Sequence, residues 1–320
     1  MGTTTPGPFS TWGISMRIRA TVAAVSGALA LSAVAVPAAQ ADDGSSHPSY
    51  RARAEQALSH VTSSGSSDSS GSSGSGRTAF RAAAPPAPDV SFSNFKVAKA
   101  VKVGTTNHVS TTATYTLTHG ADIDITSEDF ANGPFLYKGS SIDNATNMLV
   151  GDYPATCTAT SATTADCTGV IDIDPGEDWL PNSDAGTWSG GGLALTYSTR
   201  GEKLQGGLGK ILVQRNSKLT VNASPEPVKK GKTITVTGKL SRANWEDGKY
   251  HGYTGQPVKL QFRKAGSSTY TTVKTIKTNS TGNLSTTVKA SVDGYFRYGF
   301  AGTSTTPAVS AAGDYVDVTS

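Results

Sequence analysis

Segments in which every second residue is apolar recur from Asp89 to the C-terminus, and they constrain the fold of this chain more than any other feature. In residues 109–118, for example, Ala113, Tyr115 and Leu117 alternate with polar residues. Because successive side chains of a strand point to opposite faces, this period predicts half-buried strands. Only 16% of the residues are charged, so the polar faces carry mainly Thr and Ser. A sheet with one apolar face must pack on a second layer, so we expect an all-β chain built from β-sandwiches.

The candidate strands of this region fall into two groups, with a boundary near Arg215. The first group comprises residues 109–118, 122–125, 148–150, 156–160, 166–174, 193–199 and 210–214. Segments that contain Gly and Pro, among them residues 132–134 and 189–192, are predicted turns. The second group comprises residues 219–221, 233–240, 257–263, 270–277, 284–288, 295–300 and 315–318. This number and spacing are typical of immunoglobulin-like domains, so we predict two tandem Ig-like β-sandwiches at residues 89–215 and 216–320.

The first 41 residues have the pattern of a secretory signal peptide. A short cationic head begins at Met16, and the apolar run 20–37 and the cleavage motif Ala39-Gln40-Ala41 follow it. Met16 is itself a candidate start residue. A membrane anchor is the alternative, but Ser and Gly interrupt this run. Residues 42–88 are rich in Ser, Gly, Ala and Pro, which predicts a disordered linker where only residues 51–58 have some helical tendency. No later segment predicts a membrane span, so we expect a secreted, extracellular or wall-associated protein.

Cys157 and Cys167 are the only cysteines of the chain. Nine residues rich in Thr and Ala separate them, so a hairpin brings them face to face. In the oxidising compartment that the signal peptide implies, we expect a disulfide. The alternative, a redox or metal-binding pair, is disfavoured because the spacing is not C-x-x-C and no His lies nearby.

The second half of the chain resembles a known type of module. The segments that carry the resemblance are residues 230–240, 253–263, 281–288 and 294–302, with their turn glycines and a Tyr-Phe-Arg strand. Through these segments, the region 217–320 resembles the Ig-like modules of secreted proteins from high-GC Gram-positive bacteria. The resemblance implies a fold and an extracellular location. Some proteins of this kind are described as calcium-binding, although no ligand motif carries over to this sequence.

The two predicted domains have opposite charge. Residues 87–215 hold eight basic and fourteen acidic residues, a net charge of −6, and residues 216–320 hold fourteen and six, a net charge of +8. A basic module can attract anionic wall polymers. The alternative is that its lysines only provide solubility and protect sheet edges, with Lys259, Lys274, Lys277 and Lys289 as candidates. Nucleic acid is not expected as a partner, because the lysines are spread through the strands.

Two acidic segments of the first domain are candidate calcium sites. The ligand candidates are Asp122, Asp124, Glu128 and Asp129 in the first segment and Asp172, Asp174, Glu177 and Asp178 in the second. Strand alternation would place the two leading aspartates of each segment on one face, and Ca²⁺ prefers six to eight oxygen ligands. The alternative is that these carboxylates face water and begin turns, since neither segment has EF-hand spacing.

An aromatic segment between the second and third strands of the basic domain is a candidate ligand-binding loop. Trp245, Tyr250 and Tyr253 lie within residues 244–253. Exposed rings on a loop suit a sugar or a peptide because they stack and keep a polar edge. The alternative is that the Trp folds back and closes the end of a sandwich. Trp179 and Trp188 allow the same two interpretations.

Catalytic motifs are not found in the sequence. It has no G-x-S-x-G, H-E-x-x-H or P-loop pattern and, with the disulfide formed, no Cys nucleophile. We therefore predict a non-enzymatic extracellular binding or structural protein, most simply a monomer, whose partner is a cell-wall polymer or an extracellular protein. The first alternative is a carbohydrate-binding module. The second is a hydrolase that uses paired carboxylates such as Asp172 and Glu177.

Overall fold

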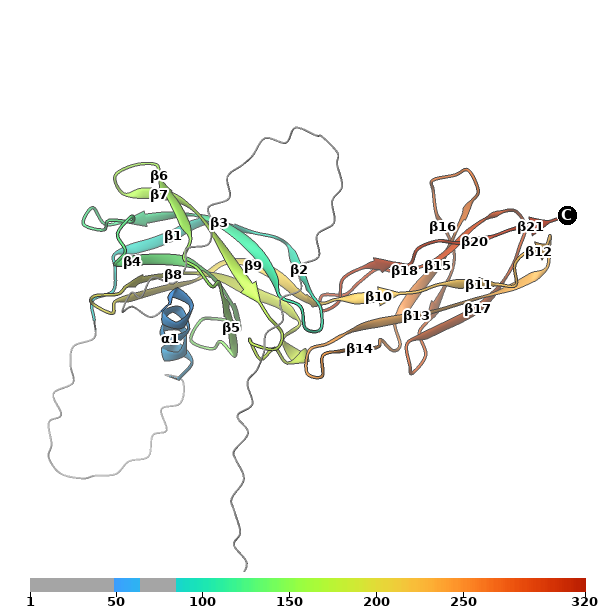
Figure 1. Ribbon diagram of the computed structural model, residues 1–320, viewed down its shortest axis with the longest axis horizontal. Helices are drawn as coiled ribbons and strands as arrows, with labels where there is room; N and C mark the ends of the chain where they lie inside the picture. Colours follow the sequence, from blue (N-terminus) through green and yellow to red (C-terminus); the bar gives the residue numbers. More distant parts are fainter. Residues whose placement is uncertain (1–48, 64–84) are drawn as a thin grey trace, which may run out of the picture. The chain divides into compact units, whose positions relative to one another are not determined.

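The computed structural model describes residues 49–63 and 85–320. The predicted signal peptide and most of the predicted linker lie outside these residues. The described residues belong to one compact unit, His47–Ser320. They form a helix and two β-sandwiches in chain order (Figure 1). None of the described helices is long and apolar enough to cross a membrane.

The first sandwich has two sheets. The strands of one sheet are, in spatial order, β1 (Val90–Val97), β3 (Val109–His119), β7 (Thr164–Ile173) and β6 (Thr156–Ala159). Those of the other are β2 (Ala100–Val103), β9 (Glu202–Arg215), β8 (Gly186–Thr196), β4 (Phe130–Lys138) and β5 (Asn147–Val150). All neighbours are antiparallel except β2 and β9. In immunoglobulin letters the orders are A-B-E-D and A′-G-F-C-C′, which is an Ig-like arrangement.

The second sandwich also has two main sheets, and the first of them has five strands. There β13 (Thr233–Asn244) is central; its neighbours are β10 (Ser217–Leu219), β11 (Asn222–Ser224), β14 (Lys249–Gly252) and β17 (Asn283–Lys289). The other sheet comprises β16 (Thr271–Lys277), β15 (Pro257–Lys264), β18 (Gly294–Phe300), β19 (Val309–Ser310) and β20 (Asp314–Val316). Two short strands, β12 (Val228–Lys229) and β21 (Val318–Thr319), pair in parallel.

Each sandwich buries its own apolar residues between its sheets. In the second sandwich the buried set includes Ile234, Leu260 and Tyr298, whose hydroxyl donates to the carbonyl of Val236. In the first, Trp188 is fully buried and donates from Nε1 to the carbonyl of Asp184 in the short 3₁₀ helix Asn182–Asp184. The prediction of an all-β chain with two tandem Ig-like β-sandwiches is confirmed.

Two predicted turns of the first domain are wrong, because residues 132–134 and 189–192 lie inside β4 and β8. They pair with each other, Pro134 opposite Gly192. The glycines of β8 make room for aromatic rings: a Cβ at Gly192 would lie 2.3 Å from the ring of Phe92. Glycine in a strand often marks such a close approach rather than a turn. Conversely, the predicted strand 122–125 is a turn, because Thr126 donates to the Asp124 carboxylate and closes the chain locally.

Helix α1 (Tyr50–Ser63) lies within the range predicted to be a disordered linker. It packs against the sheet that contains β4, β5 and β8 (Figure 1). Tyr50, Ala54, Ala57 and Leu58 are buried there. A helix this short is marginal alone in water, so its order comes from tertiary packing, which composition does not show. Gly133 of β4 makes this contact possible, since a Cβ at that position would overlap the Tyr50 hydroxyl.

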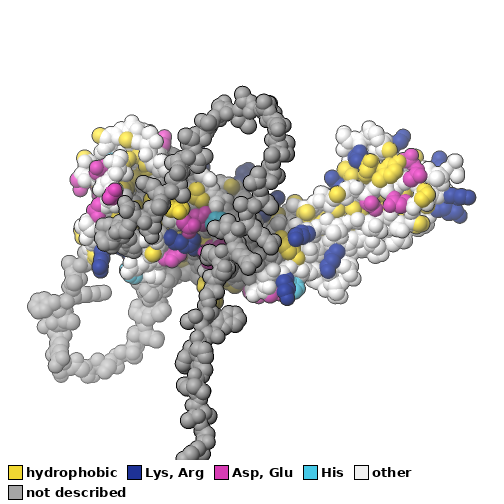
Figure 2. Space-filling model, viewed as in Figure 1, with side chains coloured by type: hydrophobic (Ala, Val, Ile, Leu, Met, Phe, Trp, Pro, Cys, Tyr) yellow, Lys and Arg dark blue, Asp and Glu magenta, His cyan; other side chains and the backbone are white. Residues whose placement is uncertain are grey.

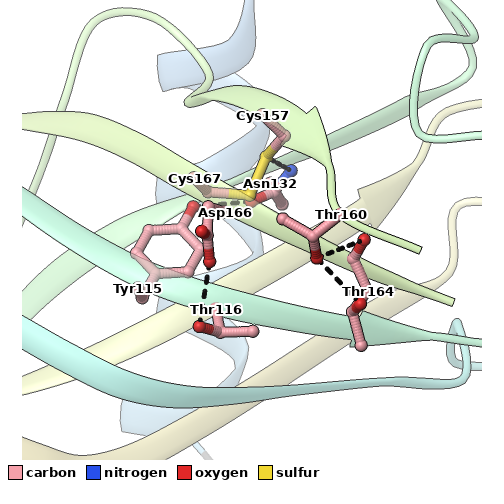
Figure 3. Close-up of a disulfide and its surroundings, with 8 residues drawn as sticks. All are labelled: Tyr115, Thr116, Asn132, Cys157, Thr160, Thr164, Asp166 and Cys167. Atoms are coloured by element: carbon pink, nitrogen blue, oxygen red, sulfur yellow. Dashed lines mark hydrogen bonds between the residues drawn. A yellow bond between two sulfur atoms is a disulfide. The ribbon is translucent and has the colours of Figure 1, made fainter.

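The predicted disulfide between Cys157 and Cys167 is confirmed. The two residues are direct cross-strand partners in β6 and β7. Figure 3 shows the bridge beside Asn132, whose side chain donates to Cys157 Sγ and accepts from the hydroxyl of Tyr115. The bond therefore joins neighbouring strands of one sheet, unlike the inter-sheet disulfide of antibody domains.

Candidate functional site

Aromatic and cationic side chains form one row across the outer face of the second sandwich. The row runs from Tyr270, just before β16, to Arg263 of β15, Tyr295 of β18 and Tyr315 of β20. Strands in a sheet lie about 4.8 Å apart, so the row extends over roughly 14 Å. Arg297 lies two residues along β18 from Tyr295. We call these five residues the Tyr–Arg face.

Strand alternation explains why these side chains point outward. In β18, Gly294, Phe296, Tyr298 and Phe300 are buried, and the residues between them are partly exposed. Tyr295 and Arg297 therefore share the outer face of the sheet. Figure 2 shows hydrophobic side chains, a class that includes Tyr, gathered on the surface over β16 and β20, with Lys, Arg, Asp and Glu side chains beside them. The face is thus an aromatic and cationic surface on the outer side of the sheet.

The rings and guanidinium groups of the face are stacked. The guanidinium carbon of Arg263 lies 4.1 Å from the ring centre of Tyr295 and 5.3 Å from that of Tyr270. Arg297 lies 3.7 Å from the ring centre of Tyr270. Tyr295 and Tyr315 have ring centres 5.1 Å apart. A cation over a ring face is attracted by the ring quadrupole, so these contacts hold the side chains in place.

Hydrogen bonds fix both arginines further. Arg263 Nη1 donates to the Ser267 carbonyl at 2.6 Å. Arg297 Nε donates to Gln261 Oε1 at 2.9 Å. Burial and the nearby carboxylates of Asp293 and Asp317 raise the pKa of Tyr315 above its ordinary value of 10.0.

Trp245 is buried rather than displayed on a loop. The predicted loop 244–253 is largely a hairpin, because β13 continues to Asn244 and pairs with β14. Trp245 is 5% exposed, belongs to the core of the first sandwich, and donates from Nε1 to the carbonyl of Val103. Its ring faces are therefore covered by protein, as in the alternative that a Trp closes the end of a sandwich.

Tyr250 and Tyr253 are partly buried on either side of this hairpin. Lys218 Nζ lies 3.8 Å from the ring centre of Tyr250. Arg242 lies 4.0 Å from the ring centre of Tyr253, which also packs edge-on against Phe300. The structure does not bring the three predicted ligand-binding residues together on one surface, because the hairpin directs Trp245 into the first sandwich.

The first acidic segment lines a hollow of about 410 Å³. Asp122, Asp124 and Asp129 are at its wall, while Glu128 is exposed and outside it. Hydrogen bonds from Thr126 lower the pKa of Asp124. The Asp129 carboxylate accepts from the backbone and hydroxyl of Ser198. Two of the four predicted calcium ligands are thus bonded within the protein.

The second acidic segment is bonded to its own turn and to α1. The Asp172 carboxylate accepts from Ser110 Oγ and from the backbone of Asp152. The Asp174 carboxylate accepts from the backbone N–H groups of Gly176 and Glu177. The side chain of Glu177 is exposed. Asp178 forms an ion pair with Arg51 of α1 at 2.6 Å. In residues 49–63 and 85–320, no three Asp, Glu, His or Cys side chains gather closely enough to hold a metal ion.

Ser110, His108 and Asp172 form a trio that superficially resembles a hydrolase triad. His108 Nε2 lies 3.1 Å from Ser110 Oγ and 3.2 Å from Asp172 Oδ1. In a triad the His contacts Ser and Asp through different ring nitrogens and takes the proton of the Ser hydroxyl. Here one nitrogen faces both groups, and Ser110 donates to Asp172 at 2.7 Å. The trio is therefore not arranged to activate Ser110 as a nucleophile.

Trp179 is the second notable aromatic position. It is 87% exposed, and its φ of 49° lies in the left-handed region that a bulky residue rarely adopts. Tyr153 is 80% exposed. Trp179 follows Asp178 and Tyr153 follows Asp152, and both of these aspartates form ion pairs with Arg51. By contrast Trp188 is in the core, so the two tryptophans that sequence treated alike have opposite environments.

Known proteins resemble this chain only in fold. No protein-family model and no curated protein matches it. A marsupial T cell receptor is 13% identical with a TM-score of 0.33, over 72% of this chain and 73% of its own. A variant of titin domains I67–I69 is 11% identical with a TM-score of 0.29, over 72% of this chain and 65% of its own. Similarity this low assigns no function.

The sequence carries one signal for the Tyr–Arg face but does not define it. Residues 295–300 have the pattern of a strand, and alternation alone places Tyr295 and Arg297 on one side. What sequence could not show is that Tyr270, Arg263 and Tyr315 lie beside them, because cross-strand register is set by the fold.

Proposed function

We propose that this protein is a secreted, non-enzymatic binding protein and that its Tyr–Arg face binds an extracellular polysaccharide. Three tyrosines and two arginines in one partly exposed row carry this proposal. Aromatic rings stack on the flat C–H faces of sugars while their hydroxyls remain available for hydrogen bonds. A row across four strands suits an extended polymer better than a small molecule, which would need a concave pocket.

The signal-peptide pattern and the disulfide support an extracellular location. A disulfide persists in oxidising compartments and is rare in the cytosol. The resemblance of residues 217–320 to Ig-like modules of secreted Gram-positive proteins agrees with this location and favours a wall polymer as the class of ligand. The net charge of +8 on this domain adds attraction to the anionic polymers of such walls.

Binding to insoluble polymers tests the proposal. Purified protein is incubated with Gram-positive cell wall, chitin and cellulose, and the bound fraction is measured by sedimentation. We expect retention on at least one polymer and a loss of about tenfold in affinity when Tyr295→Ala and Tyr315→Ala are combined, since stacking surfaces of this size carry about 1 to 2 kcal/mol.

Trp179→Ala is the matched control, because it removes an exposed ring far along the sequence from the face. Retention that is lost in Trp179→Ala but unchanged in the double tyrosine variant would transfer the binding site to the first sandwich. Absence of retention on every polymer would contradict the proposal.

A further inference from the structure

The two arginines of the Tyr–Arg face have no carboxylate partner in the described part of the chain. All ion pairs of residues 49–63 and 85–320 involve other groups. The nearest acids along the sequence accept hydrogen bonds from the backbone: Asp293 from Val318, and Asp314 from Ala223. The carboxylates of Asp293 and Asp317 lie near Tyr315 at one end of the face, but no carboxylate of the described residues is within ion-pair distance of either guanidinium.

These two charges are also held close together. Arg263 and Arg297 both contact the ring of Tyr270, at 5.3 Å and 3.7 Å from its centre. Like charges that contact the same ring repel each other, even with partial screening by water. Each guanidinium has one N–H group bound to the protein, which sets its orientation and leaves other N–H groups for a ligand. Two oriented cations on an aromatic surface, neither of them in an ion pair within the described residues, can form an anion site.

We propose that the ligand of the Tyr–Arg face is an acidic polysaccharide with carboxylate groups on its sugar rings; this inference rests on the proposed function. Arg263 lies between Tyr270 and Tyr295 in the same row. The Arg263 guanidinium lies over the ring face of Tyr295, so a sugar ring bound against the exposed edges of Tyr295 and Tyr315 has its ring substituents close to that guanidinium. A guanidinium fork matches a carboxylate through two parallel hydrogen bonds.

A carboxylate attached directly to the stacked ring fits this geometry better than a backbone phosphate. The carboxylate is held at a fixed distance from the sugar face, as the arginine is held at a fixed distance from the tyrosine ring. In a phosphodiester polymer the charge lies on flexible links between rings, so stacking and charge pairing are not coupled in the same way. Polyphosphate, which has charge but no sugar rings, therefore serves as a test of charge alone.

The experiment compares polygalacturonate with the same polymer after full methyl esterification, which removes the charge and keeps the sugar backbone. Binding of the full chain is measured by affinity electrophoresis or calorimetry. We expect esterification to weaken binding by at least tenfold. Arg263→Gln and Arg297→Gln are each expected to weaken binding of the acidic polymer by about fivefold, the effect of a partly exposed charge pair, with little effect on the esterified form.

Arg297→Lys keeps the charge but loses the fork, so it is expected to recover only part of the affinity. Melting temperatures confirm that each variant is folded, and Lys289→Gln controls for net charge. Equal binding of the two polymers would overturn this inference while leaving the proposed function intact. Binding of neither, together with retention on another polysaccharide, would also overturn it. Stronger binding of polyphosphate than of polygalacturonate would replace it with a site for charge alone.

Discussion

Replacing Arg51 with alanine should release α1 from the first sandwich. Arg51 lies 2.6 Å from Asp178 and 2.7 Å from Asp152. The side chain of Asp178 is only 6% exposed, so the substitution leaves a buried carboxylate without its cation. Removing one partner of a fully buried pair costs about 3 to 5 kcal/mol. Because the Arg51 side chain is 24% exposed, we expect about 2 to 3 kcal/mol.

The cost should depend on pH. Burial raises the pKa of Asp178 above its ordinary value of 3.8, and the backbone N–H of Asp174 and the charge of Arg51 partly offset this rise. Because the pKa of Asp178 is higher in the folded than in the unfolded protein, the free energy of unfolding falls as the pH rises from 3.8 through the folded-state pKa. Removing Arg51 raises the pKa further and widens that window. The effect of the substitution is therefore largest near pH 7 and smaller at pH 4.

Hydrogen exchange of the α1 amides measures this effect directly, since local opening of the helix exposes them. At pH 7 we expect protection in Arg51→Ala to fall by about 30- to 150-fold, the equivalent of 2 to 3 kcal/mol. Glu55→Ala removes the more exposed partner of Arg51 and should change protection by less than about threefold. A change below threefold in Arg51→Ala, or an equal change at pH 4 and pH 7, would refute the reasoning.

Four further outcomes are expected. Trp245→Ala should lower the free energy of unfolding by about 3 to 5 kcal/mol in urea titrations, because the ring is buried, whereas Trp179→Ala should change it by less than about 0.5 kcal/mol. Replacing Cys157 and Cys167 together by serine should remove about 2 to 3 kcal/mol, the chain-entropy effect of a short closed loop, and an unchanged melting temperature would contradict this. Gly192→Ala should cost about 1 to 3 kcal/mol, because its methyl would overlap an aromatic ring. Adding Ca²⁺ should leave the melting temperature unchanged, because no three Asp, Glu, His or Cys side chains of the described residues gather as metal ligands; a rise with calcium, but not with magnesium, would support the predicted sites.

The helix and the aromatic residues illustrate what could not be read from the chain alone. Residues 51–58 have weak helical tendency, and α1 is stable because it packs on the apolar outer face of β4 and β8 and because Arg51 pairs with Asp178. Trp245 and Trp179 both follow polar residues in irregular segments, yet one is buried and the other is 87% exposed. Their environments depend on which distant residues pack beside them.

The sequence by itself determined the all-β class, the two sandwiches, the disulfide and the opposite charges of the two domains. These follow from period-two patterning, cysteine spacing and composition, which are local properties of the chain. Only the tertiary structure decided the docking of α1, the strands hidden in segments rich in Gly and Pro, and the Tyr–Arg face. Each of these depends on contacts between strands or elements far apart in sequence. A row such as Tyr270, Arg263, Tyr295 and Tyr315 comes from four strands, so it exists only once their register is fixed.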